Sequence, residues 1–590
     1  MKIQLGYIIM LASCLMAGCG KSELDKESAR MMSMYGENLP LPAQDSVAAY
    51  SVKTYNGYYI GKATDCVLSY KGIPYAQPPV GRLRWHAPEP APASNDVWQA
   101  YYFGKSAIQS KDLGCLGSLY PQSEDCLTLN VWTAQNDSAS LGNRPVMVYI
   151  HGGSYGWGGS SDPMFNGHNL VKAHPDIILV TINYRLGIFG FLDLSTLKGG
   201  EDYAESANLG LLDQIEALKW VQKNIAAFGG NPDNVTIFGE SAGGGSVSLL
   251  PLIDRSRGLF RRVIAESGSV ALTSSRKQAE ELTDLVVKET GIDNVEGLME
   301  LSQEQLAELS RKVEAHNRFP MRDGKLIPLD PYRAYREGKA REIDFMTGTN
   351  SDEANYWIGS MGGIIPFKIA INVWYENIME GLPQAEREAC DRFTNDYSKG
   401  RTWGRVEFIT DLMFRIPSTF TARCHAESGG RTYNYYWTKA SALPHRGACH
   451  TVELPYVFGN LNENRYTGNN IDPKLSATVQ EMWTNFARTG DPSLPGQIWP
   501  EYNDSTRKTM VIDDTLRVES DILGNQYAVI APLADLYISP LHDNLSLNVP
   551  YVHVMAGWVL LSIAVIVVIV VVVRKSVRKC KRNQRSDMAS

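Results

Sequence analysis

The feature that most constrains the fold is a serine set among glycines, in the stretch TIFGESAGGGS at residues 236–246. The apolar residues before it are typical of a buried strand, and those after it favour a helix. A sharp turn from strand to helix strains the serine backbone and tolerates only tiny residues two positions to either side. Gly239 and Gly243 occupy those positions. Taken alone, the pattern is often a plain glycine turn, but its flanks predict a nucleophilic Ser241 at the top of a sheet.

Apolar runs alternate with helical patterns along the chain. Residues 144–153 (RPVMVYIHGG) and 176–185 (DIILVTINYR) are typical of buried strands, and residues 207–228 have apolar positions at helical spacing. Such alternation indicates an α/β fold, with a mostly parallel sheet covered by helices on both faces. Functional residues are then expected at the carboxyl ends of the strands.

A serine hydroxyl is a weak nucleophile at neutral pH and needs a base, a group that orients the base, and donors for the oxyanion. The glycine-rich stretch IHGGSYGWGG (150–159) follows a buried strand and can aim several N–H groups at one point. Ala242 begins a helix, where N–H groups lack intrahelical partners. This chemistry requires no metal or organic cofactor, and the sequence shows no metal-ligand cluster.

Charge narrows the possible partners. The formal net charge is −7, and neither sign forms a block within the body. This distribution argues against nucleic acid as a partner. The sequence leaves the oligomeric state open.

Both ends of the chain resemble targeting segments. Residues 1–19 combine one lysine, an apolar stretch and small residues, as in a secretory signal. The small residues before Cys19 and before Cys14 also fit a lipoprotein signal, of which Cys19 is favoured because Cys14 leaves a very short apolar core; an ordinary cleaved signal is the alternative. Residues 554–573 carry no charge, and a helix of that length crosses the ~30 Å hydrocarbon core. The basic residues that follow predict a cytoplasmic tail.

These features predict a single-pass protein of the cell membrane, with its body extracellular or periplasmic. The expected segments are a signal peptide (1–19), a polar tether (20–45), a catalytic body (46–540), a stalk (541–553), a transmembrane helix (554–573) and a cytoplasmic tail (574–590). The predicted compartment permits disulfides. Six cysteines lie in the body, enough for up to three bridges whose pairing the sequence does not give.

Separated blocks of the chain resemble the type-B carboxylesterase/cholinesterase family of α/β-hydrolases. Their order matches the family, and they cover nearly the whole body. The blocks are YKGIPYAQPPVGRLRW (70–85), SEDCLTLNVW (123–132), HGGSYGWG (151–158), NYRLGIFGFL (183–192), the stretch 207–244, GTNSDEANYW (348–357), GACHTVELPYVFG (447–459) and WTNFARTGDP (483–492). The resemblance implies an α/β-hydrolase fold and a serine carboxylesterase that acts on small-molecule esters.

The resemblance also implies a catalytic triad. The nucleophile matches Ser241, and the base matches His450, which closes GACH. The acid matches Glu353, with the neighbouring Asp352 as the alternative. His450 then removes the Ser241 proton during attack on the ester carbonyl, Glu353 orients the imidazole, and water cleaves the acyl-enzyme.

By the same resemblance, the oxyanion donors are the N–H groups of Gly153, Ser154 and Ala242. Ser154 stands where the family usually has a third glycine, which predicts an altered fit with the N–H retained. Trp157 and Tyr155 are candidates for the acyl pocket or for plain wall packing. The stretch 111–122 lacks the tryptophan that cholinesterases use against a quaternary ammonium, so choline esters are poor candidates.

Cysteine placement departs from the family as well. The family's first disulfide would pair Cys126 with a position that Ala107 occupies here, and Cys115 is a nearer possible partner. That bridge is therefore in doubt.

Charged residues within the family-like blocks are interpreted as structural. We expect the buried ion pairs Arg84–Glu124 and Arg185–Asp213, and a buried, paired carboxylate at Glu240. The competing functional hypothesis is a catalytically silent, neuroligin-like protein of cell-surface recognition. Relatives of that kind lose a triad member, whereas all three are present here, which favours the enzyme.

Overall fold

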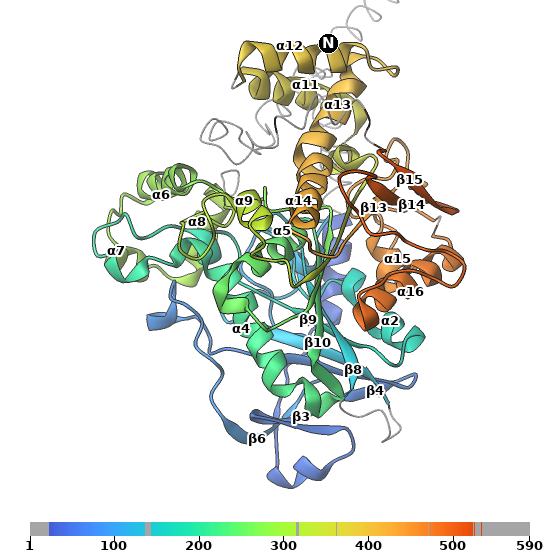
Figure 1. Ribbon diagram of the computed structural model, residues 1–590. Helices are drawn as coiled ribbons and strands as arrows, with labels where there is room; N and C mark the ends of the chain where they lie inside the picture. The colour runs from blue at the N-terminus through green and yellow to red at the C-terminus, as the bar shows by residue number, and fades with distance from the viewer. Residues whose placement is uncertain are drawn as a thin grey trace, which may run out of the picture.

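A sheet of eleven strands forms the centre of the computed structural model, which describes residues 23–135, 143–313, 318–360, 363–380, 382–469, 471–522, 524 and 533. The strand order is β15-β14-β13-β12-β11-β10-β8-β9-β7-β5-β4 (Figure 1). All pairings from β9 to β14 are parallel, and those of β4, β5, β7 and β15 are antiparallel. The predicted mostly parallel sheet is confirmed.

The strands of the central sheet are β4 (Lys62–Thr64), β5 (Val67–Pro74), β7 (Thr128–Ala134), β8 (Arg144–Ile150), β9 (Ile178–Ile182), β10 (Gly230–Glu240), β11 (Arg262–Glu266), β12 (Asp344–Asn350), β13 (Thr432–Trp437), β14 (Lys508–Ile512) and β15 (Leu516–Ser520). A smaller sheet has the order β1-β6-β3-β2. Its strands are β1 (Pro40–Leu41), β2 (Ser51–Thr54), β3 (Asn56–Ile60) and β6 (Ser94–Gln99).

Helices cover both faces of the central sheet because its strands are apolar on both sides. In β8, Val146, Val148 and Ile150 join one core cluster, while Met147 and Tyr149 join the other. The first face is covered by α3 (Gly187–Phe191), α4 (Leu209–Asn224), α5 (Ala242–Leu249) and α14 (Ile416–Glu427). The second is covered by α2 (His168–Ala173), α15 (Leu454–Phe458) and α16 (Pro473–Thr489).

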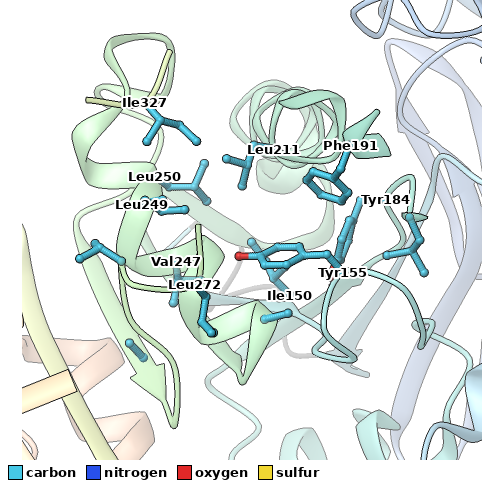
Figure 2. Close-up of a cluster of buried hydrophobic side chains, with 14 of the residues drawn as sticks. Ile150, Tyr155, Tyr184, Phe191, Leu211, Val247, Leu249, Leu250, Leu272 and Ile327 are labelled. Carbon is cyan, nitrogen blue, oxygen red and sulfur yellow. The ribbon is translucent and has the colours of Figure 1, made fainter. Parts of the chain in front are cut away.

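Figure 2 shows the first face at the end of β8, where Ile150 packs among side chains of the surrounding helices. Leu211 of α4 and Val247 of α5 are fully buried there. Each such side chain contributes about 1.5–3 kcal/mol of transfer free energy. This packing fixes α5, and with it the turn at Ser241, against the sheet.

The remaining helices lie around this core. At one side of the molecule, α6 (Arg276–Thr290), α7 (Val295–Met299), α8 (Gln303–Val313) and α9 (Pro331–Arg336) follow one another. At the top of Figure 1, α11 (Ile364–Glu380), α12 (Gln384–Asn395) and α13 (Arg401–Thr410) stand together after the short α10 (Trp357–Ser360). A π-helical turn, η12 (Asp411–Arg415), joins α13 to α14.

Residues 23–45, which the sequence analysis assigned to a polar tether, contact the body. Met31 is fully buried in the second core cluster, and an Arg30 nitrogen lies 2.7 Å from a Glu463 oxygen. The strand β1 pairs with β6. This segment therefore packs on the body and does not stand off from it.

Both predicted ion pairs form and are buried. Arg84 Nη2 lies 2.6 Å from Glu124 Oε1, and Arg185 Nη2 lies 2.6 Å from Asp213 Oδ1. Each guanidinium also donates through Nε to the second oxygen of its partner. The bidentate geometry explains how four charges remain inside the fold.

The expected disulfides are absent, because the six cysteines within the described part of the chain are all free thiols. Cys115 and Cys126 are not bridged, and an even count of cysteines says nothing of their distance in space. None of the described helices is both long and apolar enough to cross a membrane. The predicted signal (1–19) and transmembrane helix (554–573) lie outside the described residues.

Candidate active site

Ser241 stands at the turn between β10 and α5, with φ 58° and ψ −120°. A positive φ is costly for a residue with a Cβ, so the surrounding packing must hold it. A Cβ added to Gly243 would lie 1.9 Å from the carbonyl oxygen of Ile150, at the end of β8. The predicted close approach of helix and strand is therefore confirmed, and it strongly favours glycine at position 243.

His450 lies in the loop after β13, and its Nδ1 is 2.7 Å from Oε2 of Glu353. Glu353 follows β12 and is fully buried. Its other oxygen, Oε1, accepts hydrogen bonds from Ser267 Oγ at 2.6 Å and from the Asn350 N–H at 2.8 Å. These bonds fix the carboxylate, which in turn favours a proton on Nδ1 and leaves Nε2 as the basic nitrogen.

The basic nitrogen of His450 lies against Glu240, the residue that directly precedes Ser241. Nε2 lies 3.0 Å from Oε1 of Glu240, which is 2% exposed. Glu240 is buried, as expected, and the basic group that contacts its carboxyl is the imidazole, which forms an ion pair with it only when Nε2 carries a proton. Ser241 and His450 line the same cavity, although the Ser241 hydroxyl makes no hydrogen bond to the imidazole in this arrangement of described residues.

Four carboxyl groups are buried around this histidine, those of Glu240, Glu266, Glu353 and Glu453. Burial raises the pKa of Glu240 well above its usual value, with further contributions from Glu453 and Glu353. Burial, and then the charge of Glu353, raises the pKa of Glu453 to about 7. Burial also raises the pKa of Glu266. Closely spaced carboxyls favour protonation of their neighbours, so Glu240, Glu266 and Glu453 bind protons more readily than free glutamates do.

The loop after β8 supplies unpaired backbone donors. The N–H groups of Gly153 and Ser154 have no acceptor among the described residues, and both residues line the cavity. Ser154 and Tyr155 have φ angles of 52° and 55°. Ala242 opens α5, so its N–H also lacks an intrahelical partner. Three donors predicted from the sequence thus belong to residues that line one cavity with Ser241.

The two aromatic candidates for the acyl pocket lie in different places in the structure. Trp157 lines the cavity, whereas Tyr155 is fully buried in the core on the other side of its loop (Figure 2). Phe414 lies in the π-helical turn, with its ring 4.6 Å from that of His450. Tyr356 meets the same imidazole edge-on at 5.6 Å. Aromatic packing on the imidazole limits its rotation.

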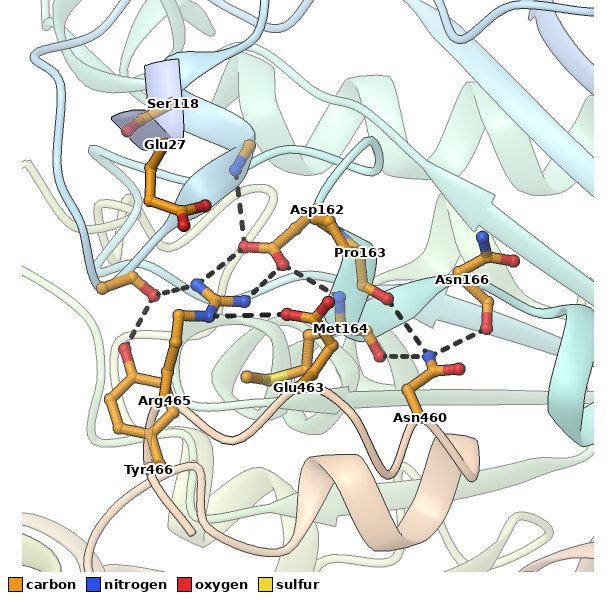
Figure 3. Close-up of polar contacts among 12 residues, drawn as sticks. Glu27, Ser118, Asp162, Pro163, Met164, Asn166, Asn460, Glu463, Arg465 and Tyr466 are labelled. Atoms are coloured by element: carbon orange, nitrogen blue, oxygen red, sulfur yellow. Dashed lines mark hydrogen bonds and ion pairs between the residues drawn. The ribbon is translucent and has the colours of Figure 1, made fainter. Parts of the chain in front are cut away.

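A polar network ties one wall of the cavity to the loop after α15 (Figure 3). Arg465 donates to both carboxylate oxygens of Asp162 and to the carbonyl of Gly114. Tyr466 Oη donates to the same carbonyl at 2.7 Å. Asn460 donates to carbonyls of the residues that follow Asp162. Asp162, Gly114 and Tyr466 all line the cavity, so this network fixes its shape.

Sequence reasoning missed several side chains of this site. Asn350 lies just before Glu353 in the block 348–357, and Glu453 lies just after His450 in the block 447–459. Their closeness in sequence to the two triad candidates could have indicated that they belong to the site. Ser267 directly follows β11, and functional residues gather at the carboxyl ends of the strands in such sheets. Nothing in the sequence indicated that Phe414 belongs to the site, because its position depends on a π-helical turn. No group of three or more metal-ligating side chains gathers in the described part of the chain.

A strained serine after a parallel strand, a carboxylate-bound histidine and free backbone amides together define a serine hydrolase. The profile of the Carboxylesterase family matches residues 49–530, and the chain belongs to that family. The para-nitrobenzyl esterase of Bacillus subtilis (strain 168) is 38% identical over 487 residues, which cover 80% of this chain and 96% of that protein.

Two further comparisons bear on fold and function. A solved structure of PNB esterase aligns with a TM-score of 0.72 and 34% identity, covering 81% of this chain and 99% of the other. This agreement confirms the α/β-hydrolase fold. Neuroligin-3 of Mus musculus is 32% identical over 501 residues, covering 73% of this chain and 59% of its own length. The family therefore includes both enzymes and neuroligins.

Proposed function

We propose that the chain is a serine carboxylesterase in which Ser241 is the nucleophile, His450 the base and Glu353 the acid that orients it. The observation that carries the proposal is the Glu353–His450 hydrogen bond of 2.7 Å beside the strained turn at Ser241. The carboxylate stabilises the imidazolium that forms when Nε2 takes the Ser241 proton. Asp352, the alternative acid, bonds instead to the Ser351 hydroxyl and the Ala448 N–H.

In the first step, the Ser241 oxygen attacks the ester carbonyl and His450 Nε2 accepts its proton. The carbonyl oxygen becomes an oxyanion that the N–H groups of Gly153, Ser154 and Ala242 receive. His450 then protonates the departing alcohol, and an acyl-enzyme remains. Water, deprotonated by the same nitrogen, releases the acid and restores Ser241.

Attack requires the Ser241 hydroxyl to meet Nε2. Catalytic hydrogen bonds are often long in substrate-free enzymes and tighten when substrate binds. We propose that the bound ester turns the hydroxyl towards the imidazole, within the cavity that both residues already line. Because Nδ1 is held by Glu353, Nε2 is the nitrogen left for this role, and the hydroxyl must take the place beside Nε2 that Oε1 of Glu240 now occupies.

Hydrolysis of p-nitrophenyl esters of increasing acyl length tests the proposal, with Ser241→Ala as the matched control. We expect hydrolysis by the wild type, with short to medium acyl chains preferred, and almost none by the variant. Equal rates from both proteins would remove Ser241 from the mechanism. They would leave the silent, neuroligin-like recognition protein as the better interpretation.

We further propose that this esterase is anchored in the cell membrane by residues 554–573, with the body outside the cytoplasm. The support is the uncharged length of that stretch and the basic residues after it. Protease added to intact cells should remove the body and spare the tail. Digestion of the tail from outside would reverse the proposed topology.

A further inference from the structure

One buried guanidinium bonds to the segment that carries the proposed acid. Arg415 is the last residue of the π-helical turn η12, and its side chain is 3% exposed. Its Nη2 donates to the carbonyl oxygen of Ser351 at 2.8 Å, two residues before Glu353. Glu353 in turn bonds to His450. Arg415 therefore contacts the backbone from which the catalytic acid projects.

The Arg415 guanidinium is held in place by its own neighbours. Its Nη1 lies 2.8 Å from Oε1 of Glu407, in α13, and 2.7 Å from Oδ1 of Asp411, in the turn. Its Cζ lies 5.0 Å from the ring centre of Tyr436, in cation–π contact. Because a planar guanidinium carries donors on several sides, it can serve both carboxyl groups and the carbonyl of Ser351 at once.

A second hydrogen bond joins the same two segments. Thr410, the last residue of α13, accepts the Ala354 N–H through Oγ1 at 3.2 Å. Thr410 is 1% exposed and directly precedes the π-helical turn. The segment Ser351–Ala354 is therefore bonded to this helical run on both sides of Glu353.

The turn between these two bonds also contacts the base. Phe414 directly precedes Arg415, lines the cavity and places its ring 4.6 Å from that of His450. Figure 1 shows α13 and α14 running from the top of the molecule towards the central sheet, with η12 between them. Single π-helical turns inside α-helices are frequent at functional sites. One helical element therefore contacts both the segment of the acid and the ring of the base.

We propose that Arg415 and Thr410 are positioning residues of the esterase, which hold the segment Ser351–Ala354 so that Glu353 meets His450 in the reactive geometry. This inference rests on the proposed function. Neither positioning residue is among the described residues that line the cavity, so both act through Glu353. The Glu353 carboxylate stabilises the imidazolium that forms in the transition state. A displacement of about 1 Å at a catalytic group can lower a rate about 100-fold.

Arg405 is a matched control in the same helical run. It lies in α13, its side chain is 5% exposed, and it bonds to Glu376 at 2.5 Å and to Asn372 at 2.7 Å. Its Cζ also lies 4.4 Å from the ring centre of Tyr375. Arg405 and Arg415 are therefore both buried, ion-paired and in contact with a tyrosine ring. These partners of Arg405, however, belong to α11 and not to the proposed triad or its segments.

The test compares kcat and KM for p-nitrophenyl acetate in the full-length wild type, Arg415→Met, Arg415→Lys and Arg405→Met. The short acyl group limits contact with the cavity wall. The rate at which an organophosphonate labels Ser241 is measured as well, because that single step needs the same base. Thermal unfolding establishes that each variant is folded. Burial raises the pKa of Asp411 to about 7 despite the charge of Arg415, so Asp411 can become neutral in Arg415→Met.

We expect Arg415→Met to lower kcat and the labelling rate about 10- to 100-fold, while KM stays within about threefold of the wild type. Arg415→Lys should fall between the two proteins, because an ammonium keeps the charge but lacks the planar set of donors. Arg405→Met should leave kcat and the labelling rate close to those of the wild type. Equal kcat and labelling rates in Arg415→Met and Arg405→Met would overturn the inference, as would a loss confined to KM.

If Arg415→Met does not fold, Thr410→Val and Thr421→Val decide. Both replace a buried threonine by a residue of nearly the same shape. Only Thr410 bonds to the segment of the acid, whereas Thr421 bonds to Pro417 of its own helix. Thr410→Val should lower kcat at least about fivefold relative to Thr421→Val, and equal kcat would overturn the inference. Wild-type hydrolysis no faster than that of Ser241→Ala would refute the proposed function itself, which is a different outcome.

Discussion

Replacing Gly243 by alanine tests the turn that presents Ser241. The added Cβ would lie 1.9 Å from the Ile150 oxygen and 2.9 Å from the Ile150 carbonyl carbon. Because both obstacles are backbone atoms, α5 or the end of β8 must move by about 1.5 Å to reach ordinary contact distance. Such overpacking costs about 1–3 kcal/mol or more, against a gain of about 1 kcal/mol in helix propensity.

Gly245 offers a matched control in the same helix. An added Cβ there meets side-chain atoms, Tyr155 Oη at 2.9 Å and Leu272 Cβ at 3.1 Å, which can yield by small shifts. Both variants share the gain in helix propensity, so the difference between them reports the clash. We expect Gly243→Ala to be less stable than Gly245→Ala by about 2 kcal/mol, measured by chemical denaturation.

Activity should follow the same order. Ile150 directly precedes the loop of Gly153 and Ser154, so a displaced β8 end moves the proposed oxyanion donors. Loss of one such donor typically costs ~10²–10³ in kcat. We expect kcat to fall at least about 100-fold in Gly243→Ala and to remain within a few-fold in Gly245→Ala. Equal stability and equal kcat in the two variants would refute the close approach.

Two further predictions concern buried charge. Asp213→Asn should lower the free energy of unfolding by about 3–5 kcal/mol because it leaves Arg185 buried without its carboxylate. Glu337→Gln, which removes one charge of an exposed ion pair, should change the same quantity by less than about 1 kcal/mol. Equal effects of the two substitutions would contradict this reasoning. The pKa of Glu453 is raised to about 7 in the folded state, so the stability that its proton contributes is present below about pH 4.5 and is lost as the pH rises through 7. The free energies of unfolding of Glu453→Gln and the wild type are therefore compared at pH 5 and pH 8, and the variant should gain stability relative to the wild type as the pH rises. A difference that stays constant between the two pH values would mean that the pKa of Glu453 is not shifted.

The sequence was sufficient for the parts of the site that depend on local geometry. The turn at Ser241 was predictable because a strand, a serine and small residues at fixed offsets leave few other backbone paths. The pairs Arg84–Glu124 and Arg185–Asp213 were expected from the family-like blocks that contain them, and the structure gives the reason for the pairing, since a buried charge must be compensated. The central sheet followed from apolar runs alternating with helical patterns.

Other parts depend on long-range packing that no local pattern records. The contact of Glu240 with His450 Nε2 joins residues more than two hundred positions apart, so adjacency to Ser241 could not reveal it. Phe414 reaches the imidazole only because a π-helical turn redirects it. The prediction of a polar tether missed the packing of residues 23–45 on the body for a similar reason. The polar composition of this segment does not indicate that a single side chain such as Met31 is buried in the core. The number of cysteines likewise could not tell whether any of them would pair, and the six within the described residues are free thiols.

The most direct test of the account is to map the residue that becomes covalently attached to the substrate. The full chain is treated with a serine-directed organophosphonate, digested, and analysed by peptide mass spectrometry. The account predicts one stoichiometric adduct on Ser241, loss of ester hydrolysis in proportion to labelling, and no adduct in Glu353→Gln or His450→Gln at the same exposure. Full labelling at another residue, or hydrolysis that survives complete modification of Ser241, would contradict it.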